Sequence, residues 1–253
     1  MFSLIKWEIK KNLRLGTLII WALGLVLGFK GVFTNFGIEE AYAALFSKYY
    51  LLTVPFMAFA MFTMFSGSFV REYNSNVAGL IKASKNGKQR LVLVKFIANG
   101  ISASIINLSV LMVMLVRVMA EFKFEGLDLP VKNLWYFANS GSNITILQML
   151  LIVSLTVVLG SFLFAAIGLY LSSLSKRATM PLIFGGLTIG IPYFIAFMGK
   201  KEVIFSLLVN GMFSQQIVRY GLPISYWIVF ILVALILIVG LYNLTKKRFL
   251  KEI

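Results

Sequence analysis

The sequence predicts an all-α integral membrane protein that forms one transmembrane domain over residues 1–253. Three observations support this fold class: a mean hydropathy of +0.91, a charged fraction of only 13%, and apolar runs that recur along the whole length. A soluble domain of this size has too little interior to hide so many apolar side chains from water. The runs also lack the alternating polarity of barrel strands, whereas helices satisfy their own backbone hydrogen bonds in lipid.

Six apolar segments are long enough to cross a bilayer. Each exceeds the roughly 20 residues that a helix needs to span a hydrocarbon core of about 30 Å. The first contains a single charged residue, Lys30, near one end, and the other five contain none. The predicted spans are Leu15–Phe36, Tyr49–Val70, Phe96–Val116, Ile144–Leu174, Ala178–Gly199 and Pro223–Leu244.

The placement of the charges predicts the orientation of these spans. Six crossings put both termini on one side, together with the 71–95 loop and Lys176–Arg177, and that side holds 16 Lys and Arg against three acids. The other side holds eight Lys and Arg against six acids. Cytoplasmic loops carry the excess of basic residues, so we expect a multi-pass plasma-membrane protein with both termini in the cytoplasm. The net charge of +15 then orients the chain and attracts anionic lipid headgroups rather than nucleic acid.

The N-terminal segment, residues 1–14, has the pattern of an amphipathic helix. Its apolar residues fall near one helical face and its basic residues supply the other, which is typical of a helix lying in the membrane interface. The apolar set is Phe2, Leu4, Ile5, Ile9 and Leu13, with Trp7 at its edge, and the basic set is Lys6, Lys10, Lys11 and Arg14. The alternative is a frayed basic tail.

The sequence shows no constellation for catalysis, for a cofactor or for a metal ion. It contains no Cys and no His, which removes the thiolate, the commonest metal ligand and the commonest general base. The segment around Gly87-Lys88 lacks a phosphate-binding pattern, because Lys82 stands where the first glycine belongs and Gln89 where Ser or Thr should hold magnesium. We therefore expect a protein that is not an enzyme.

Small residues and phenylalanines in the spans are candidates for contacts with other molecules. Glycines at GxxxG spacing let helices approach closely. Here they would serve a seam between two chains or, as is more common, the packing of helices within one chain. Phenylalanines could line a path for an amphipathic substrate, and core or lipid-facing positions are the alternative. The seam candidates are Gly24, Gly28, Gly186 and Gly190; the path candidates are Phe59, Phe62, Phe65, Phe162 and Phe164.

Two loops carry apolar residues that a simple connection would not need. In the cytoplasmic loop 71–95, Val77, Leu80 and Ile81 form an i, i+3, i+4 apolar set before the Asn86-Gly87 turn. Such a short helix can lie on lipid, cap the bundle, or insert into a groove of a cytoplasmic partner. The outer segment 200–222 contains an apolar stretch too short to cross, which predicts a re-entrant segment.

This layout resembles the permease subunits of ABC-2-type transporters. The resemblance covers the whole chain: a basic interfacial helix, six spans, a Pro- and Gly-rich fifth span, and a first cytoplasmic loop with Glu after the second span and an "S…R.LVL.K" run before the third. The sequence departs from the common loop pattern at Ala83-Ser84, where a proline often stands. The residues that carry the resemblance are Glu72, Leu80, Ile81, Ser84, Arg90 and Lys95, with Val77 on the same predicted coupling helix.

The resemblance implies a pair of permeases, each docked through this coupling helix to a separate ATP-binding cassette ATPase, and it is this partner subunit that would bind ATP and magnesium. Within this family, the chain is most similar in its size and Phe content to the Gram-positive exporters and immunity permeases that handle antimicrobial or toxin peptides, including phenol-soluble modulins. The expected partners are the ATPase, a second permease copy or a relative, membrane lipids and a peptide substrate. Two alternatives remain from the residues: a non-transporting membrane sensor or immunity protein that binds a peptide or lipid-like ligand, and a channel.

Overall fold

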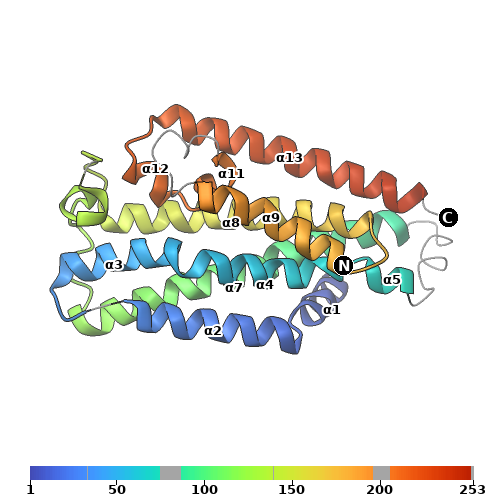
Figure 1. The fold of residues 1–253 in the computed structure, drawn as a ribbon, viewed down its shortest axis with the longest axis horizontal. Coiled ribbons are helices and arrows are strands. Elements are labelled where there is room, and N and C mark those ends of the chain that lie inside the picture. The colour runs from blue at the N-terminus through green and yellow to red at the C-terminus, as the bar shows by residue number, and fades with distance from the viewer. Residues whose placement is uncertain (33, 75–86, 139, 196–205, 252–253) are drawn as a thin grey trace.

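The described residues of the chain fold into one elongated bundle of helices (Figure 1). The computed structural model describes residues 1–32, 34–74, 87–138, 140–195 and 206–251, and these contain helices and no strands. The long helices are α2 (Leu15–Gly31), α3 (Ile38–Leu51), α4 (Thr53–Ser66), α7 (Gly87–Phe122), α8 (Ile146–Ser173), α9 (Thr179–Ile195) and α13 (Ile224–Lys251). The shorter ones are α1 (Phe2–Asn12), α5 (Val70–Asn74), η1 (Val131–Asn133), η2 (Trp135–Phe137), α11 (Leu207–Met212) and α12 (Gln215–Arg219).

Several of these helices are long and apolar enough to cross a membrane. The helices α7, α8 and α13 qualify individually, and two bent pairs, α1 with α2 and α3 with α4, raise the number of candidate spans to five. The helix α9 is apolar but has only 17 residues in the described part of the chain. The prediction of a helical membrane protein is therefore supported, whereas the six-span topology is not confirmed.

The second predicted span differs most from the structure. The sequence placed it at Tyr49–Val70, but the helix already begins at Ile38 and bends by 43° between α3 and α4. Gly37, with φ of +107°, precedes α3 as its N-cap, and Glu39 and Glu40 occupy the first turn, where the helix dipole favours negative charge. These acids were counted as loop residues because charge marks a span boundary but does not stop a helix.

A proline explains how the chain tolerates the break between α3 and α4. Pro55 has no backbone N–H, so the carbonyl of Leu51 four residues earlier loses its usual helical partner. The hydroxyl of Tyr193 on α9 donates to that carbonyl at 2.6 Å. The bend is thus tied to α9 by a hydrogen bond that replaces the missing helical one.

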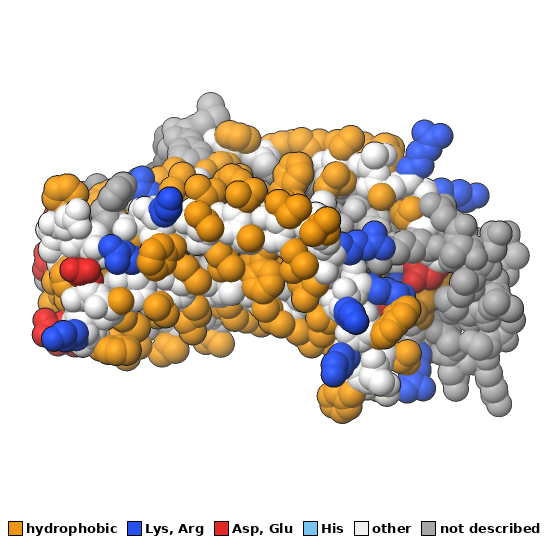
Figure 2. Space-filling view, turned by 90° about the horizontal axis from the view of Figure 1, so that it is seen from below, with side chains coloured by type: hydrophobic (Ala, Val, Ile, Leu, Met, Phe, Trp, Pro, Cys, Tyr) orange, Lys and Arg blue, Asp and Glu red, His pale blue; other side chains and the backbone are white. Residues whose placement is uncertain are grey.

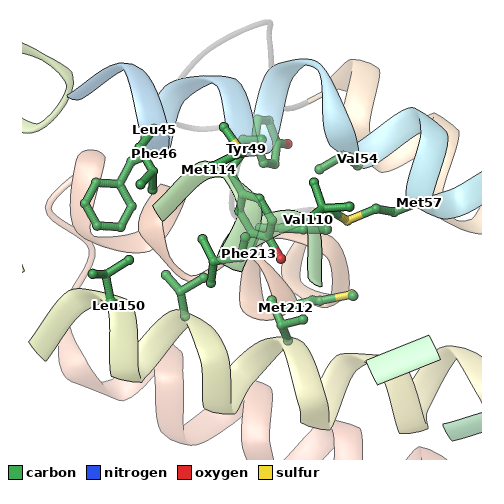
Figure 3. Packing of buried hydrophobic residues seen from close by; sticks show 14 of the residues in the cluster. Leu45, Phe46, Tyr49, Val54, Met57, Val110, Met114, Leu150, Met212 and Phe213 are labelled. Atoms are coloured by element: carbon green, nitrogen blue, oxygen red, sulfur yellow. The ribbon is translucent and has the colours of Figure 1, made fainter. Parts of the chain in front are cut away.

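The core lies where α3 and α4 face α7, α8 and the short helix α11 (Figure 3). Leu45, Phe46 and Tyr49 of α3 point toward Met114 of α7 and Phe213 just beyond α11. The ring centroids of Tyr49 and Phe213 are 5.7 Å apart, in an edge-to-face arrangement. Aromatic side chains from separate parts of the sequence therefore hold α11 inside the bundle.

Polar and apolar surfaces are separated along the long axis. Figure 2 shows hydrophobic side chains over the middle of one face, with charged side chains gathered toward the two ends. The helix α1 and the C-terminal end of α13 lie at the same end of the bundle (Figure 1). An apolar middle between charged ends is the surface that a bilayer requires. Which end faces the cytoplasm stays a prediction.

Candidate functional site

Four charged side chains meet at the end of the bundle where α1 lies. Lys95 of α7 is central: its Nζ is 2.8 Å from Glu72 Oε1 on α5 and 3.0 Å from Glu8 Oε2 on α1. Lys11 Nζ lies 2.8 Å from Glu8 Oε1 and 4.0 Å from Glu72 Oε1. We call Glu8, Lys11, Glu72 and Lys95 the charge cluster. The charges of its two acids and two lysines cancel, so the cluster can be buried without burying a net charge.

The cluster is largely removed from solvent. Lys95 is 2% exposed, Glu72 7% and Glu8 8%, whereas Lys11 remains at the edge, with its Nζ 4.2 Å from the centre of the Trp7 ring. Lysine is almost never buried to this degree without a partner. The pairing with Glu8 and Glu72 is therefore a condition for placing Lys95 inside the protein.

A chain of polar side chains continues from the charge cluster into the bundle. Asn12 of α1 donates from Nδ2 to Asn99 Oδ1 at 2.7 Å and lies 3.3 Å from Ser102 Oγ. Asn99 in turn donates from its own Nδ2 to Ser68 Oγ at 3.0 Å, between α4 and α5. These four residues, the polar chain, fasten α1 to α7 and to the α4–α5 turn.

Helical spacing explains why these side chains meet. Lys95, Asn99 and Ser102 stand at i, i+4 and i+7 on α7, which places them on one face. Glu8 and Asn12 stand at i and i+4 on α1, and these two are the buried positions of that helix. The face of α1 that packs on α7 is therefore polar, while Phe2, at 90%, and other apolar residues remain exposed.

Electrostatics fix the protonation of Glu8. Burial alone raises the pKa of its carboxyl, but the positive charge of Lys95 and the hydrogen bonds from Lys11 and Lys95 outweigh burial and lower the pKa below 4.5. Glu72 is less completely satisfied, because its Oε2 is buried and accepts no hydrogen bond from any described residue.

The structure brings together two of the residues predicted to couple to an ATPase. Glu72 and Lys95, near the two ends of the predicted 71–95 loop, form the ion pair described above. The predicted loop is too long at its second end, because α7 already begins at Gly87 and Lys95 lies on that helix. Arg90, also on α7, is exposed. The predicted coupling helix itself, with Val77, Leu80, Ile81 and Ser84, lies outside the described residues.

The predicted seam glycines have two different surroundings. Gly24 and Gly28 are buried against Val110 of α7, and Met114 also lies close to Gly28, so the close approach they allow is used within one chain. Gly186 and Gly190 of α9 face open space, with nothing within 4 Å of an added Cβ. The prediction of a seam between two chains is therefore kept for Gly186 and Gly190 alone.

The predicted path phenylalanines do not share one surface. Phe62, Phe65 and Phe164 are fully buried, and the ring of Phe62 lies 5.6 Å from that of Phe65 and 6.4 Å from that of Phe164. Phe162 is half-buried beside Phe96, and Phe59 is 60% exposed. In this conformation three of the five are core residues, so a continuous route along them would require α4 and α8 to separate.

The predicted re-entrant segment, 200–222, contains the short helices α11 and α12 in its described part. Both are buried within the bundle. Asn210 accepts a hydrogen bond from the hydroxyl of Tyr50 at 3.3 Å, and Thr156 Oγ1 lies 3.0 Å from the Met212 carbonyl. That this segment enters a membrane stays a prediction.

Sequence reasoning missed Glu8, Asn12, Asn99, Ser68 and Ser102. Their signal was present, because Lys95, Asn99 and Ser102 form a polar stripe at helical spacing inside an apolar run, and Glu8 is an isolated acid in a basic helix. The sequence analysis assigns α1 one apolar and one basic face. It does not consider the third face, which carries Glu8 and Asn12 and is buried.

Comparison with models of known protein families and with curated protein sequences gave no match to this chain.

Proposed function

We propose that this chain is the transmembrane permease subunit of an ATP-driven exporter, which moves amphipathic or antimicrobial peptides outward and relies on a separate ATP-hydrolysing subunit. One observation supports the proposal best: the two ends of the 71–95 loop, Glu72 and Lys95, are joined to each other and to α1 by the buried charge cluster. A loop anchored in this way moves together with the helices that carry it.

The anchoring supplies the mechanical link that such a transporter needs. Lys95 belongs to α7, which packs extensively on α8, and Asn99 on the same helix ties α1 through Asn12. A displacement of the loop by a partner would reach α1, α5 and α7 together, because buried ion pairs are costly to break one partner at a time. Rigid-body movement of packed helices is an established form of such switching.

The first experiment asks whether an ATPase accompanies the chain. The chain is solubilised in a mild detergent, captured by a tag, and the proteins that come with it are identified and assayed for ATP hydrolysis. We expect one ATP-binding subunit in stoichiometric amount. If the chain performs its cellular task without any ATP-hydrolysing companion, the proposal fails and the sensor or immunity alternative is favoured.

The second experiment tests the predicted coupling helix. Replacing Leu80 and Ile81 by glutamate removes the apolar set and should abolish substrate-stimulated transport and co-purification of the ATPase, with membrane insertion unchanged. The matched control replaces Ser75 and Asn76 by glutamate, which adds the same charge at polar positions of the same loop. Equal transport by the two double variants would contradict the proposed docking.

The third experiment concerns a second permease copy. Gly186→Leu with Gly190→Leu enlarges the open face of α9, whereas Gly240→Leu enlarges an equally open position on α13. If two chains meet through α9, the first variant lowers the dimer fraction measured by mass photometry and the second leaves it unchanged. Identical dimer fractions would remove α9 from the seam.

A further inference from the structure

An apolar groove opens on the surface between α2 and α4. It has a volume of about 220 Å³ and is lined by Ile20 and Leu23 of α2 and by Pro55, Phe56 and Phe59 of α4. Phe59 is 60% exposed and Leu23 49%, so the groove is open along one side. None of its lining side chains is polar. The predicted path through the bundle does not use it, apart from Phe59.

The groove continues inward as a narrow recess. Ile20 and Phe56 line both spaces, and Trp21, Gly24 and Val110 belong to the recess. The indole of Trp21 is held in place because its Nε1 donates to Ser109 Oγ at 2.8 Å. Pro55 and the bend before it set the start of α4, and Gly24 keeps α2 close to α7, so the walls belong to packed elements rather than to a loop.

The depth of the groove matches the acyl region of one leaflet. Arg14 precedes α2, and a rise of 1.5 Å per residue places Leu23 about 14 Å further along the helix axis. The hydrocarbon half of a bilayer is about 15 Å thick. If the charged end of α1 and α2 lies at the headgroups, the groove therefore lies among the acyl chains.

We infer that this groove binds an acyl chain of an anionic phospholipid from the leaflet on the α1 side. An apolar cavity of about 150 Å³ holds a benzene molecule, so about 220 Å³ has room for roughly nine carbon atoms of a chain. Arg14, Lys10 and Lys6 are exposed at the headgroup end, and within the described residues no ion pair engages them. Positive charge at this level selects an anionic headgroup.

Selectivity must come from fit and charge, because a lipid tail in the bilayer is already in apolar surroundings. The tail gains contacts with the aromatic walls of Phe56 and Phe59, and the phosphate gains a basic neighbour. One basic residue near the surface corresponds to about a fivefold preference for an anionic lipid over a zwitterionic one. This inference does not rest on the proposed transport function.

The test uses Trp21 as a reporter in the full chain. Trp7, Trp135 and Trp227 are replaced by phenylalanine, and the chain is reconstituted in nanodiscs that contain phosphatidylglycerol or phosphatidylcholine with brominated acyl chains, which quench tryptophan fluorescence on contact. We expect several-fold more quenching of Trp21 by the brominated phosphatidylglycerol at equal mole fraction. A second chain that retains only Trp227, on α13, should be quenched equally by the two lipids.

Variants assign the effect to the groove. Leu23→Phe narrows it and should remove the excess quenching by phosphatidylglycerol, and Ile20→Phe should do the same. The matched control, Leu18→Phe, adds the same ring to an exposed position of α2 outside the groove and should keep the excess. Arg14→Gln should reduce the excess without changing the quenching by phosphatidylcholine.

Three results would overturn the inference. Equal quenching of Trp21 by the two lipids would show that the site does not select an anionic headgroup. Equal excess quenching in Leu23→Phe and Leu18→Phe would show that the lipid does not bind in the groove. Quenching by an amphipathic peptide with a brominated side chain, without any excess from phosphatidylglycerol, assigns the groove to a peptide instead.

Discussion

Lys95 and Glu72 close the 71–95 loop at its base, with 2.8 Å between Nζ and Oε1. Glu8 of the N-terminal helix α1 completes the arrangement by approaching the same ammonium group. The base of the loop is therefore held by charges from three helices, α1, α5 and α7.

Lys95→Met should lower the stability of the chain by about 3–5 kcal/mol, because it leaves two buried carboxylates with only Lys11 near them. The measurement is the midpoint of thermal unfolding in detergent. Lys132→Met, at an exposed lysine of η1, is the control and should leave the midpoint nearly unchanged. Combining Lys95→Met with Glu72→Gln should recover part of the loss. Equal midpoints for Lys95→Met and the control would show that the cluster does not stabilise the fold.

Stability should fall at acid pH through Glu8. Burial raises the pKa of Glu8, but Lys95 and Lys11 lower it overall, so the folded value lies below the reference of 4.5. A carboxyl with a lowered folded pKa contributes stability above the unfolded value and loses it as pH falls through the folded value. The unfolding midpoint, measured from about pH 7 to about pH 3, should therefore drop below pH 4.5 in the native chain.

The matched comparison for this pH effect uses two glutamine variants. Glu8→Gln removes the titrating group and should give a flatter acid limb, at a lower midpoint near neutral pH. Glu39→Gln, at an exposed glutamate of α3, should keep the native profile. A native slope in Glu8→Gln would mean that another carboxyl controls the acid transition.

The fold class follows from the sequence because it depends on sums over many residues. Apolar runs locate the helices α7, α8 and α13, but only α8 keeps its predicted bounds to within two residues. The helix α7 begins nine residues before and ends six residues after the predicted span, and α13 continues seven residues beyond its own, because polar residues can extend a helix past its apolar run. Thr145 illustrates the effect of a cap: with Gln148 it forms a capping box, and α8 begins at Ile146, two residues after the predicted start of the span. The break between α3 and α4 was not predicted, because Pro55 was treated as an ordinary residue of a span.

The charge cluster was harder to predict for a physical reason. The charge pattern places Glu72 and Lys95 in one loop and the resemblance implies a coupling role for both, but their pairing depends on how α5 and α7 approach each other. Glu8 lies far from both in sequence, and its burial is visible only once α1 is packed on α7. Periodicity identifies the face of a helix, whereas the partner of that face is set by tertiary packing.

Asn99→Leu should destabilise the chain by about 1–3 kcal/mol. The change leaves the amide of Asn12 without its 2.7 Å acceptor and Ser68 without its donor, and both are buried. Asn133→Leu, at an exposed position of η1, is the control. Thermal unfolding of Asn12→Leu, Asn99→Leu and the double variant gives the coupling energy between them. A coupling energy near zero would show that the two side chains do not depend on each other.

Neighbouring glycines of α9 should respond oppositely to the same substitution. The ring of Phe62 on α4 lies against Gly185, and an added Cβ would collide with it, whereas Gly186 faces open space. Gly185→Ala should therefore cost about 1–3 kcal/mol through overpacking. Gly186→Ala should be neutral or stabilise by up to about 1 kcal/mol, because alanine has the higher helix propensity. The unfolding midpoint in detergent measures both.

The two variants share a helix, a side chain and a gain in helix propensity, so the difference between them isolates the contact with Phe62. That contact joins α4 to α9, and the hydrogen bond from Tyr193 to the Leu51 carbonyl is a second, separate link to α9. If the two variants unfold at the same temperature, Phe62 moves aside at no cost and α9 packs loosely on α4. A helix that packs loosely there would separate from α4 more easily than the structure implies, and the close fit of ring and glycine would then not determine the position of α9.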